Sequence, residues 1–229
     1  MSIAEKLTTI AQNQEKVHNA GKDSEWNAFW DSYQNNGKRI GYYYGFCGLG
    51  WSDETFKPKY DIKASGTGAY MFIYNAVTDI KGKLEELGVR LDTSKVNNFQ
   101  SSFAYSKSIA YPVLDFSNAT STNVAFSDCT NLQYIEKIIV APKVSFNGTF
   151  KNCTSLEHIR IEGTIGQSID FSYSPLLSRA SIENIIGCLS GTVTGKTLTL
   201  SQTAVNNAFT VDEWNTLIEG KTNWTISLV

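Results

Sequence analysis

The middle of the chain repeats one short pattern at a nearly constant spacing. The two clearest copies begin at Phe126 and Phe150, 24 residues apart, and share the pattern Phe-x-x-Cys-x-x-Leu-x-x-Ile. A third copy begins at Phe103, and looser copies begin at Phe72 and Phe171. A unit of this length cannot bury its apolar side chains alone, so the repeat predicts a solenoid in which neighbouring units stack.

Charge and composition argue against several classes of protein. The 229 residues carry 20 basic and 22 acidic side chains, a net charge of −2, so no basic field favours nucleic acid or anionic lipid. The first ten residues lack the basic and apolar regions of a secretory signal. No stretch approaches the roughly 20 apolar residues of a membrane span. We therefore expect no nucleic acid partner, no membrane insertion and no signal peptide.

The cysteines are too few and too widely spaced for a disulfide framework. They are Cys47, Cys129, Cys153 and Cys188. Cys129 and Cys153 occupy the same position in successive repeats. We expect both to be buried reduced thiols that pack as small apolar residues, which is a common role of free cysteine.

Residues 1–21 are predicted to form an N-terminal helix suited to self-association. A capping box from Ser2 to Glu5 marks its start, and Gly21 marks its end. A heptad seam follows, with one polar position that can set the register of a coiled coil. An amphipathic helix lying on its own domain is the alternative. The seam, and hence the predicted oligomerisation site, is Ile3, Leu7, Ile10, Gln14 and Val17.

Residues 22–60 predict a helical, aromatic cap for the first repeat. A helix face is indicated by Trp26, Phe29, Trp30 and Tyr33, and a glycine-flanked loop containing Tyr42–Tyr44 follows. Terminal units of a solenoid need such a cover over the exposed end of the core. A ligand platform that includes Tyr43 is one interpretation of the loop. Packing of its rings between the helix and the first repeat is the other.

Residues 61–177 predict a strand and a turn in each repeat. The run from Leu156 to Ile161 is apolar at its first, fourth and sixth positions, so His158 and Arg160 are expected to face outward. Counting from the repeated phenylalanines gives two tyrosines as the equivalents of His158. Asparagines are expected in the left-handed positions of the turns, at Asn118, Asn131, Asn147 and Asn152. An ordinary solvent-exposed sheet is the alternative to a binding column formed by Tyr111, Tyr134, His158 and Arg160.

Residues 178–229 change character and predict a capping unit of helices and strands. Ser178 is expected to cap a helix, and a strand is expected at 197–200. A second capping box runs from Thr210 to Glu213 and starts another helix. The final strand is expected at 224–228. This unit would close the C-terminal end of the stack.

The chain contains few of the residues that catalytic and cofactor-binding motifs require. The only histidines are His18 and His158, which leaves almost no basis for a catalytic triad or a histidine-based metal site. The run Gly191–Thr197 resembles a phosphate-binding loop, but it has three residues between its glycines where that motif needs four. Its predicted context is also a helix followed by a strand. We expect no enzyme, no catalytic residues, no metal and no cofactor.

The repeat motif closely resembles the BspA-like bacterial leucine-rich repeats over about residues 61–186. The flanks at 1–11 and 25–34 look like leucine-rich-repeat proteins encoded by phages and prophages of gut Firmicutes, and the ending is similar to their terminal unit. The resemblance implies an α/β solenoid, namely a short BspA-like leucine-rich repeat with a helical N-terminal segment and a helix-strand C-terminal cap.

The same resemblance implies a non-enzymatic virion structural protein, associated with a bacteriophage tail or tail fibre and active in host attachment. Its expected partners are other virion proteins and a host surface protein or glycan, and its expected place is the virion, assembled in the bacterial host cytoplasm. A homo-oligomer is expected, with a trimer as first choice because phage fibres usually are trimers. Secreted BspA-like adhesins carry export signals that this chain lacks. The alternative is a non-virion adhesin-like or scaffold module for protein–protein interaction.

Overall fold

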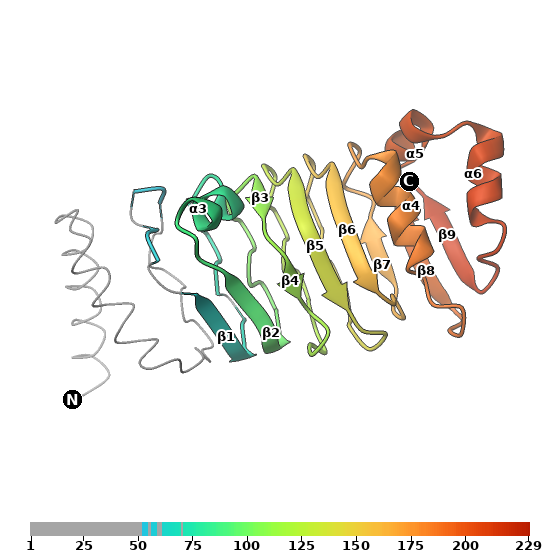
Figure 1. Cartoon of the computed structure of the whole chain (residues 1–229). Coiled ribbons are helices and arrows are strands. Elements are labelled where there is room, and N and C mark those ends of the chain that lie inside the picture. The colour runs from blue at the N-terminus through green and yellow to red at the C-terminus, as the bar shows by residue number, and fades with distance from the viewer. Residues whose placement is uncertain (1–51, 55, 59–60, 70) are drawn as a thin grey trace.

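The computed structural model describes residues 52–54, 56–58, 61–69 and 71–229. Strands dominate the first two thirds of this part, and helices gather near the C-terminus (Figure 1). In chain order the elements are β1 (Ile62–Thr67), α3 (Ile80–Glu86), β2 (Leu91–Asn98), β3 (Ala110–Tyr111), β4 (Leu114–Asp115), β5 (Tyr134–Val140), β6 (His158–Gly163), β7 (Ile169–Phe171), α4 (Arg179–Gly187), β8 (Lys196–Leu200), α5 (Gln202–Ala208), α6 (Val211–Ile218) and β9 (Trp224–Leu228).

The predicted helix over 1–21 and the part of the predicted cap over 22–51 lie outside the described residues and stay predictions, and so do two site predictions within them. One is the ligand platform that includes Tyr43. The other is the oligomerisation seam of Ile3, Leu7, Ile10, Gln14 and Val17.

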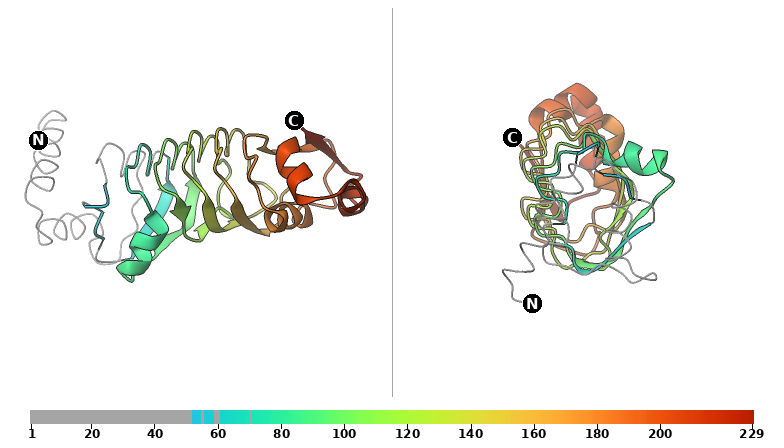
Figure 2. Two further views of the ribbon diagram at one scale, coloured as in Figure 1. Left: turned by 90° about the horizontal axis from the view of Figure 1, so that it is seen from above. Right: turned by 90° about the vertical axis from the view of Figure 1, so that its left-hand side faces the viewer.

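The strands pair in parallel, and the chain winds once around a common interior between one strand and its partner. β1 pairs with β2, β5 pairs with β3, β4 and β6, and β8 pairs with β7 and β9. Parallel strands need a long connection, and here the connection is the rest of the repeat. Thus Tyr134 lies opposite His158, 24 residues later. Seen end-on, successive coils superpose around one interior (Figure 2).

A ladder of phenylalanines fills the interior. Neighbouring rings lie 5.8, 4.7, 5.8 and 4.6 Å apart between centroids, and their planes are nearly parallel. This confirms the prediction that Phe126 and Phe150 are buried, and Leu132 and Leu156 are buried beside them. Aromatic pairs of this kind contribute about 0.5–1.5 kcal/mol each beyond the burial of their area. The ladder consists of Phe72, Phe103, Phe126, Phe150 and Phe171.

Cys129 and Cys153 each connect their own coil to the preceding coil by a hydrogen bond. The thiol of Cys129 donates to the carbonyl oxygen of Phe103 at 3.0 Å, and that of Cys153 donates to the carbonyl oxygen of Phe126 at 3.2 Å. Both side chains are buried, as expected. Burial raises the pKa of Cys129 to about 12, so its thiol stays protonated and keeps its hydrogen bond.

The turns correct one expectation from the sequence. Of the four asparagines expected in left-handed positions, only Asn152 has a positive φ; Asn118, Asn131 and Asn147 do not. The left-handed residues instead recur two positions before and two positions after the ladder phenylalanines. Hydrogen bonds between coils fix the backbone at these positions. The backbone conformation therefore depends on the position in the turn and not on the type of residue. These residues are Tyr74, Ser101, Tyr105, Val124, Asp128, Gly148 and Asn152.

The C-terminal unit matches the sequence expectation closely. The side chain of Ser178 caps α4 by accepting a hydrogen bond from the amide of Ser181. The capping box from Thr210 to Glu213 starts α6, and β8 and β9 contain the two strands expected at 197–200 and 224–228. The expectation did not include α5 as a helix.

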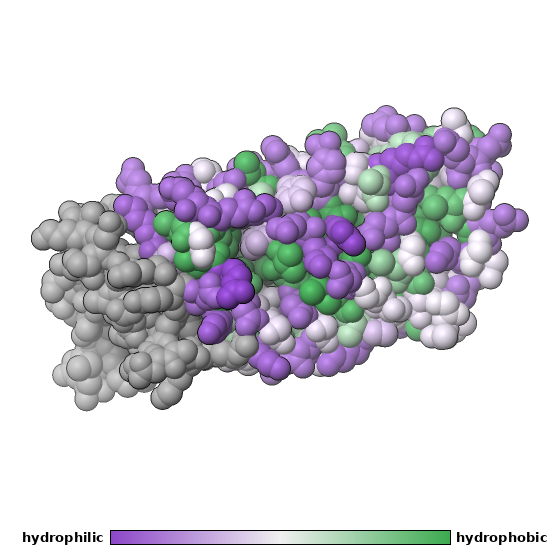
Figure 3. Space-filling view, in the orientation of Figure 1, coloured by the Kyte–Doolittle hydropathy of each residue, from purple (hydrophilic) through white to green (hydrophobic). Residues whose placement is uncertain are grey.

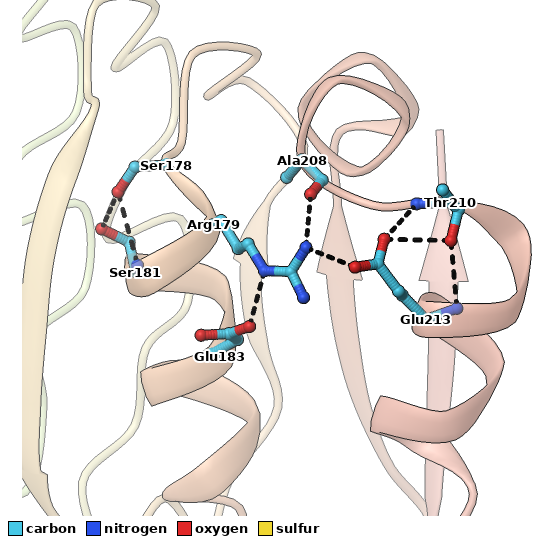
Figure 4. Close-up of polar contacts among 7 residues, drawn as sticks. All are labelled: Ser178, Arg179, Ser181, Glu183, Ala208, Thr210 and Glu213. Atoms are coloured by element: carbon cyan, nitrogen blue, oxygen red, sulfur yellow. Dashed lines mark hydrogen bonds and ion pairs between the residues drawn. The ribbon is translucent and has the colours of Figure 1, made fainter.

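Arg179 fastens the helices of this unit to one another (Figure 4). Its guanidinium donates to Glu183 and Glu213, each at 2.8 Å, and to the carbonyl oxygen of Ala208 at 3.3 Å. It also lies over the ring of Phe209, 4.7 Å from the centroid. Because these contacts come from three helical segments, we assign Arg179 to the stability of the cap.

Replacing Phe126 by Ala should lower the free energy of unfolding by about 3–5 kcal/mol, because the change opens a cavity in the middle of the ladder. Urea unfolding followed by circular dichroism measures this. Asn207→Ala, at an exposed position of α5, is the matched control and should change stability by less than about 0.5 kcal/mol. Similar values for the two variants would contradict the ladder.

The charge of Glu213 should make stability depend on pH in a defined window. Hydrogen bonds from Thr210 and Arg179 lower the pKa of this carboxyl from 4.5 to about 2. A folded-state pKa below the unfolded value stabilises the fold above pH 4.5, and this contribution is lost as the pH falls towards about 2. The stability difference between the natural protein and Glu213→Gln should therefore shrink across that window in denaturant titrations. A difference that does not change with pH would contradict it.

Candidate interaction surface

The strands β5 and β6 present a small aromatic and charged surface to solvent. Tyr134 lies directly opposite His158, their rings meet edge to face with centroids 6.2 Å apart, and both side chains are exposed. Arg160 is two residues along β6 from His158, so it is on the same face of the strand, and it is exposed too. The outward orientation expected for these three residues is confirmed.

The expected outward position of Tyr111 is wrong. Its side chain is fully buried, its ring packs against Phe103 and Phe126, and its hydroxyl donates to Oγ of Ser106 at 2.7 Å. The residue opposite Tyr134 is Ala110.

The misplacement has a simple geometric cause. From the ladder phenylalanine to the strand position opposite Tyr134 or His158 there are eight residues in the later repeats, but only seven from Phe103 to Ala110. A slip of one residue moves a strand side chain to the other face. Counting from Phe103 therefore placed Tyr111 outside, and burial instead raises the pKa of its phenol well above the usual range.

The helix α3 adds a residue that sequence reasoning missed. Nζ of Lys81 lies 6.0 Å from the centroid of the Tyr134 ring and 3.8 Å from a carboxylate oxygen of Glu136. Its hydrogen bond to Glu85, one turn along the helix, raises the pKa of the Lys81 amine. The segment from 81 to 88 reads in the sequence only as an insertion, which carries no signal for its position relative to β5.

The side of this surface near the C-terminus is held by α4. Nδ1 of His158 is 3.2 Å from Oγ of Ser178, the residue that caps α4, and Nε2 is 3.3 Å from a carboxylate oxygen of Glu157. Figure 3 shows apolar surface exposed among polar side chains over the middle strands. We call the aromatic and charged surface formed by β5, β6 and the start of α3 the sheet-face cluster. Its members are Lys81, Tyr134, Glu136, His158 and Arg160.

A second row of residues runs along the turns, two positions after each ladder phenylalanine, with exposed tyrosines and with Asp128 and Asn152 half-buried. Tyr74, Tyr105 and Tyr173 are 66, 48 and 45% exposed, and the rings of Tyr74 and Tyr105 stack with centroids 4.9 Å apart. The spacing of the repeats carried a signal for this row, because each member follows its phenylalanine at a fixed distance. We call it the turn column: Tyr74, Tyr105, Asp128, Asn152 and Tyr173.

Hydrogen bonds order the middle of the turn column. The carboxylate of Asp128 accepts from Nδ2 of Asn152 at 2.7 Å and from Oγ of Ser127 at 2.6 Å. The first of these bonds is the main cause that lowers the pKa of Asp128. The same carboxylate charge raises the pKa of Tyr105. The hydrogen bond between Asn152 and Asp128 thus fixes the orientation of these two side chains.

Two tyrosines of the turn column have a strained backbone. Tyr74 and Tyr105 have φ values of 56° and 57°, in the left-handed region that asparagine and glycine tolerate better. This conformation costs roughly 1–2 kcal/mol per residue for other side chains. Their mutual stacking contributes about 0.5–1.5 kcal/mol, which offsets only part of the cost of two such residues.

The described part of the chain offers no cluster of three or more histidine, cysteine, aspartate or glutamate side chains placed to hold a metal ion. None of its helices is long and apolar enough to cross a bilayer. The run Gly191–Thr197 follows α4 and its last two residues belong to β8, which is the helix-then-strand context expected from the sequence.

Comparison of the chain with protein-family models, with curated protein sequences and with solved structures finds no significant match.

Replacing Tyr111 by Phe should lower the free energy of unfolding by about 0.5–1.5 kcal/mol, because the change removes the hydrogen bond to Ser106 inside the core. Tyr134→Phe is the matched control, and at an exposed position it should leave stability nearly unchanged. Thermal and urea unfolding measure both variants. Equal stability for the two variants would argue against the observed register of β3.

Proposed function

We propose that the chain is a non-enzymatic structural protein of a bacteriophage particle, associated with the tail or a tail fibre. In this proposal its repeats form a short BspA-like leucine-rich-repeat solenoid, capped by helices at both ends, that contacts a host surface protein or glycan. The resemblance of the repeat motif supports this, as do the parallel strands that recur at the repeat spacing. Fold analogy alone does not give a function, so the choice of contact surface rests on the residues.

The observation that carries a contact role is the exposed sheet-face cluster on a rigid stack of coils. Tyrosine and arginine dominate the binding energy of many interfaces. Here Tyr134, His158 and Arg160 lie on two hydrogen-bonded strands between α3 and α4, and His158 is held through Ser178. Side chains fixed before binding lose less entropy when they meet a partner.

Self-association through residues 1–21 completes the proposal. A trimer would present three sheet-face clusters together, and avidity would then strengthen a weak single contact. Self-association is tested by measuring the mass in solution of the intact chain and of a chain lacking residues 1–21. The intact chain should be a trimer and the shortened one a monomer, and monomers in both cases would contradict self-association.

The place in a virion is tested by mass spectrometry of purified phage particles induced from the bacterium that carries the gene. The chain should be present in stoichiometric amounts, and its absence from intact particles would favour a non-virion scaffold instead.

The contact role is tested with the triple variant Tyr134→Ala, His158→Ala and Arg160→Ala in the purified intact chain. Binding to host cells should fall at least tenfold while the thermal unfolding midpoint stays close to that of the natural protein. The control is the double variant Asn207→Ala and Glu219→Ala, at exposed positions in the C-terminal unit, which should bind normally. Full binding by the triple variant would reject the sheet-face cluster.

A further inference from the structure

The turn column combines features that a purely structural turn does not require. Asparagine fits the left-handed position two residues after the ladder phenylalanine, and Asn152 occupies it in one coil. Tyr74 and Tyr105 instead place large exposed rings on the same kind of strained backbone. Ser101 and Val124, which lie outside the column, have the same backbone conformation, so the large exposed rings are what set Tyr74 and Tyr105 apart.

Backbone hydrogen bonds to the neighbouring coil fix three members of the column. The amides of Tyr74, Tyr105 and Asp128 each donate to a carbonyl of the next coil, at 2.9, 2.9 and 2.8 Å. The side chains then follow one another at the spacing of adjacent strands, about 5 Å. A ligand that meets the column along its length must therefore be an extended chain with a short repeat.

The exposed groups of the column are hydroxyl, amide and aromatic groups. Tyr105 is exposed and its hydroxyl can donate and accept, and Asn152 uses one amide N–H for Asp128 and keeps its carbonyl oxygen and second N–H. Asp128 is the one charged member, and its carboxylate already accepts from Ser127 and Asn152, with Lys151 close by. These features suit a partner that is rich in hydroxyl groups and has no net charge.

We propose that the turn column binds a neutral polysaccharide that lies along the axis of the coils. An extended chain of pyranose sugars advances by about one coil spacing per sugar unit, so successive sugars meet successive members of the column. Hydroxyl groups of the sugars exchange hydrogen bonds with Tyr105, Asn152 and the phenols of Tyr74 and Tyr173. Because the rings of Tyr74 and Tyr105 stack on each other, the sugars contact the exposed edges of these rings. This binding does not depend on the role proposed for the sheet-face cluster.

The test uses the intact chain in affinity gel electrophoresis with soluble dextran, galactomannan, mixed-linkage β-glucan, xylan and amylopectin in separate gels. At least one neutral polymer should retard the natural protein. The double variant Tyr74→Asn and Tyr105→Asn should lose at least tenfold in apparent affinity for that polymer. Asparagine suits the left-handed backbone, so the variant should fold, with an unfolding midpoint no more than a few degrees from that of the natural protein.

The triple variant of the sheet-face cluster is the matched control and should keep full retardation, which separates this binding from the proposed host contact. Retardation by none of the five polymers would overturn the proposal. So would equal retardation of the folded double asparagine variant and the natural protein. Stronger binding to the anionic polymers polyglutamate or polyphosphate would also overturn it, because it would identify a charged ligand.

Discussion

The ladder of phenylalanines is the interaction on which the rest of this structure depends. Each of the three inner rings, Phe103, Phe126 and Phe150, is covered on both faces by the ring of a neighbouring coil, and the distances of 4.6 to 5.8 Å leave no room for another side chain between them. One repeat alone would expose its ring on both faces, so the coils are stable only as a stack. The positions of the strands and the turns follow from that stacking.

The ladder also explains why the surface carries regular rows. A residue close in sequence to a ladder phenylalanine lies next to its counterpart in the adjacent coil, whereas farther along the repeat the count can change by one residue, as it does at Ala110. The sheet-face cluster and the turn column are two such rows on different sides of the same coils. Because the backbone under both rows is held by hydrogen bonds between coils, their side chains are oriented before any partner arrives.

The ends and the insertion modify this regular scheme. At the C-terminal end Arg179 links α4 to the segments that follow, and the last strands pair in register with β7. At the other end of the described stack, the inserted helix α3 brings Lys81 over Tyr134 and next to Glu136. Arg179 and Lys81 both add charge near an otherwise repetitive surface. They therefore make the two ends of the stack of coils different from its middle.

The amino-acid sequence by itself determined the repeat spacing, the buried phenylalanines, leucines and cysteines, and the caps at Ser178 and Thr210. Each of these depends on local patterns: periodic apolar residues, and polar side chains that satisfy free amides at helix starts. Only the tertiary structure decided that Tyr111 is buried, that Lys81 reaches Tyr134, and that left-handed turns fall at Tyr74 and Tyr105. The physical reason is that hydrogen bonds to the next coil set the phase between a turn and its strand. One residue more or less in the turn moves each side chain of the following strand between the interior and the surface. The sequence around Tyr111 contains no local pattern that indicates this shift.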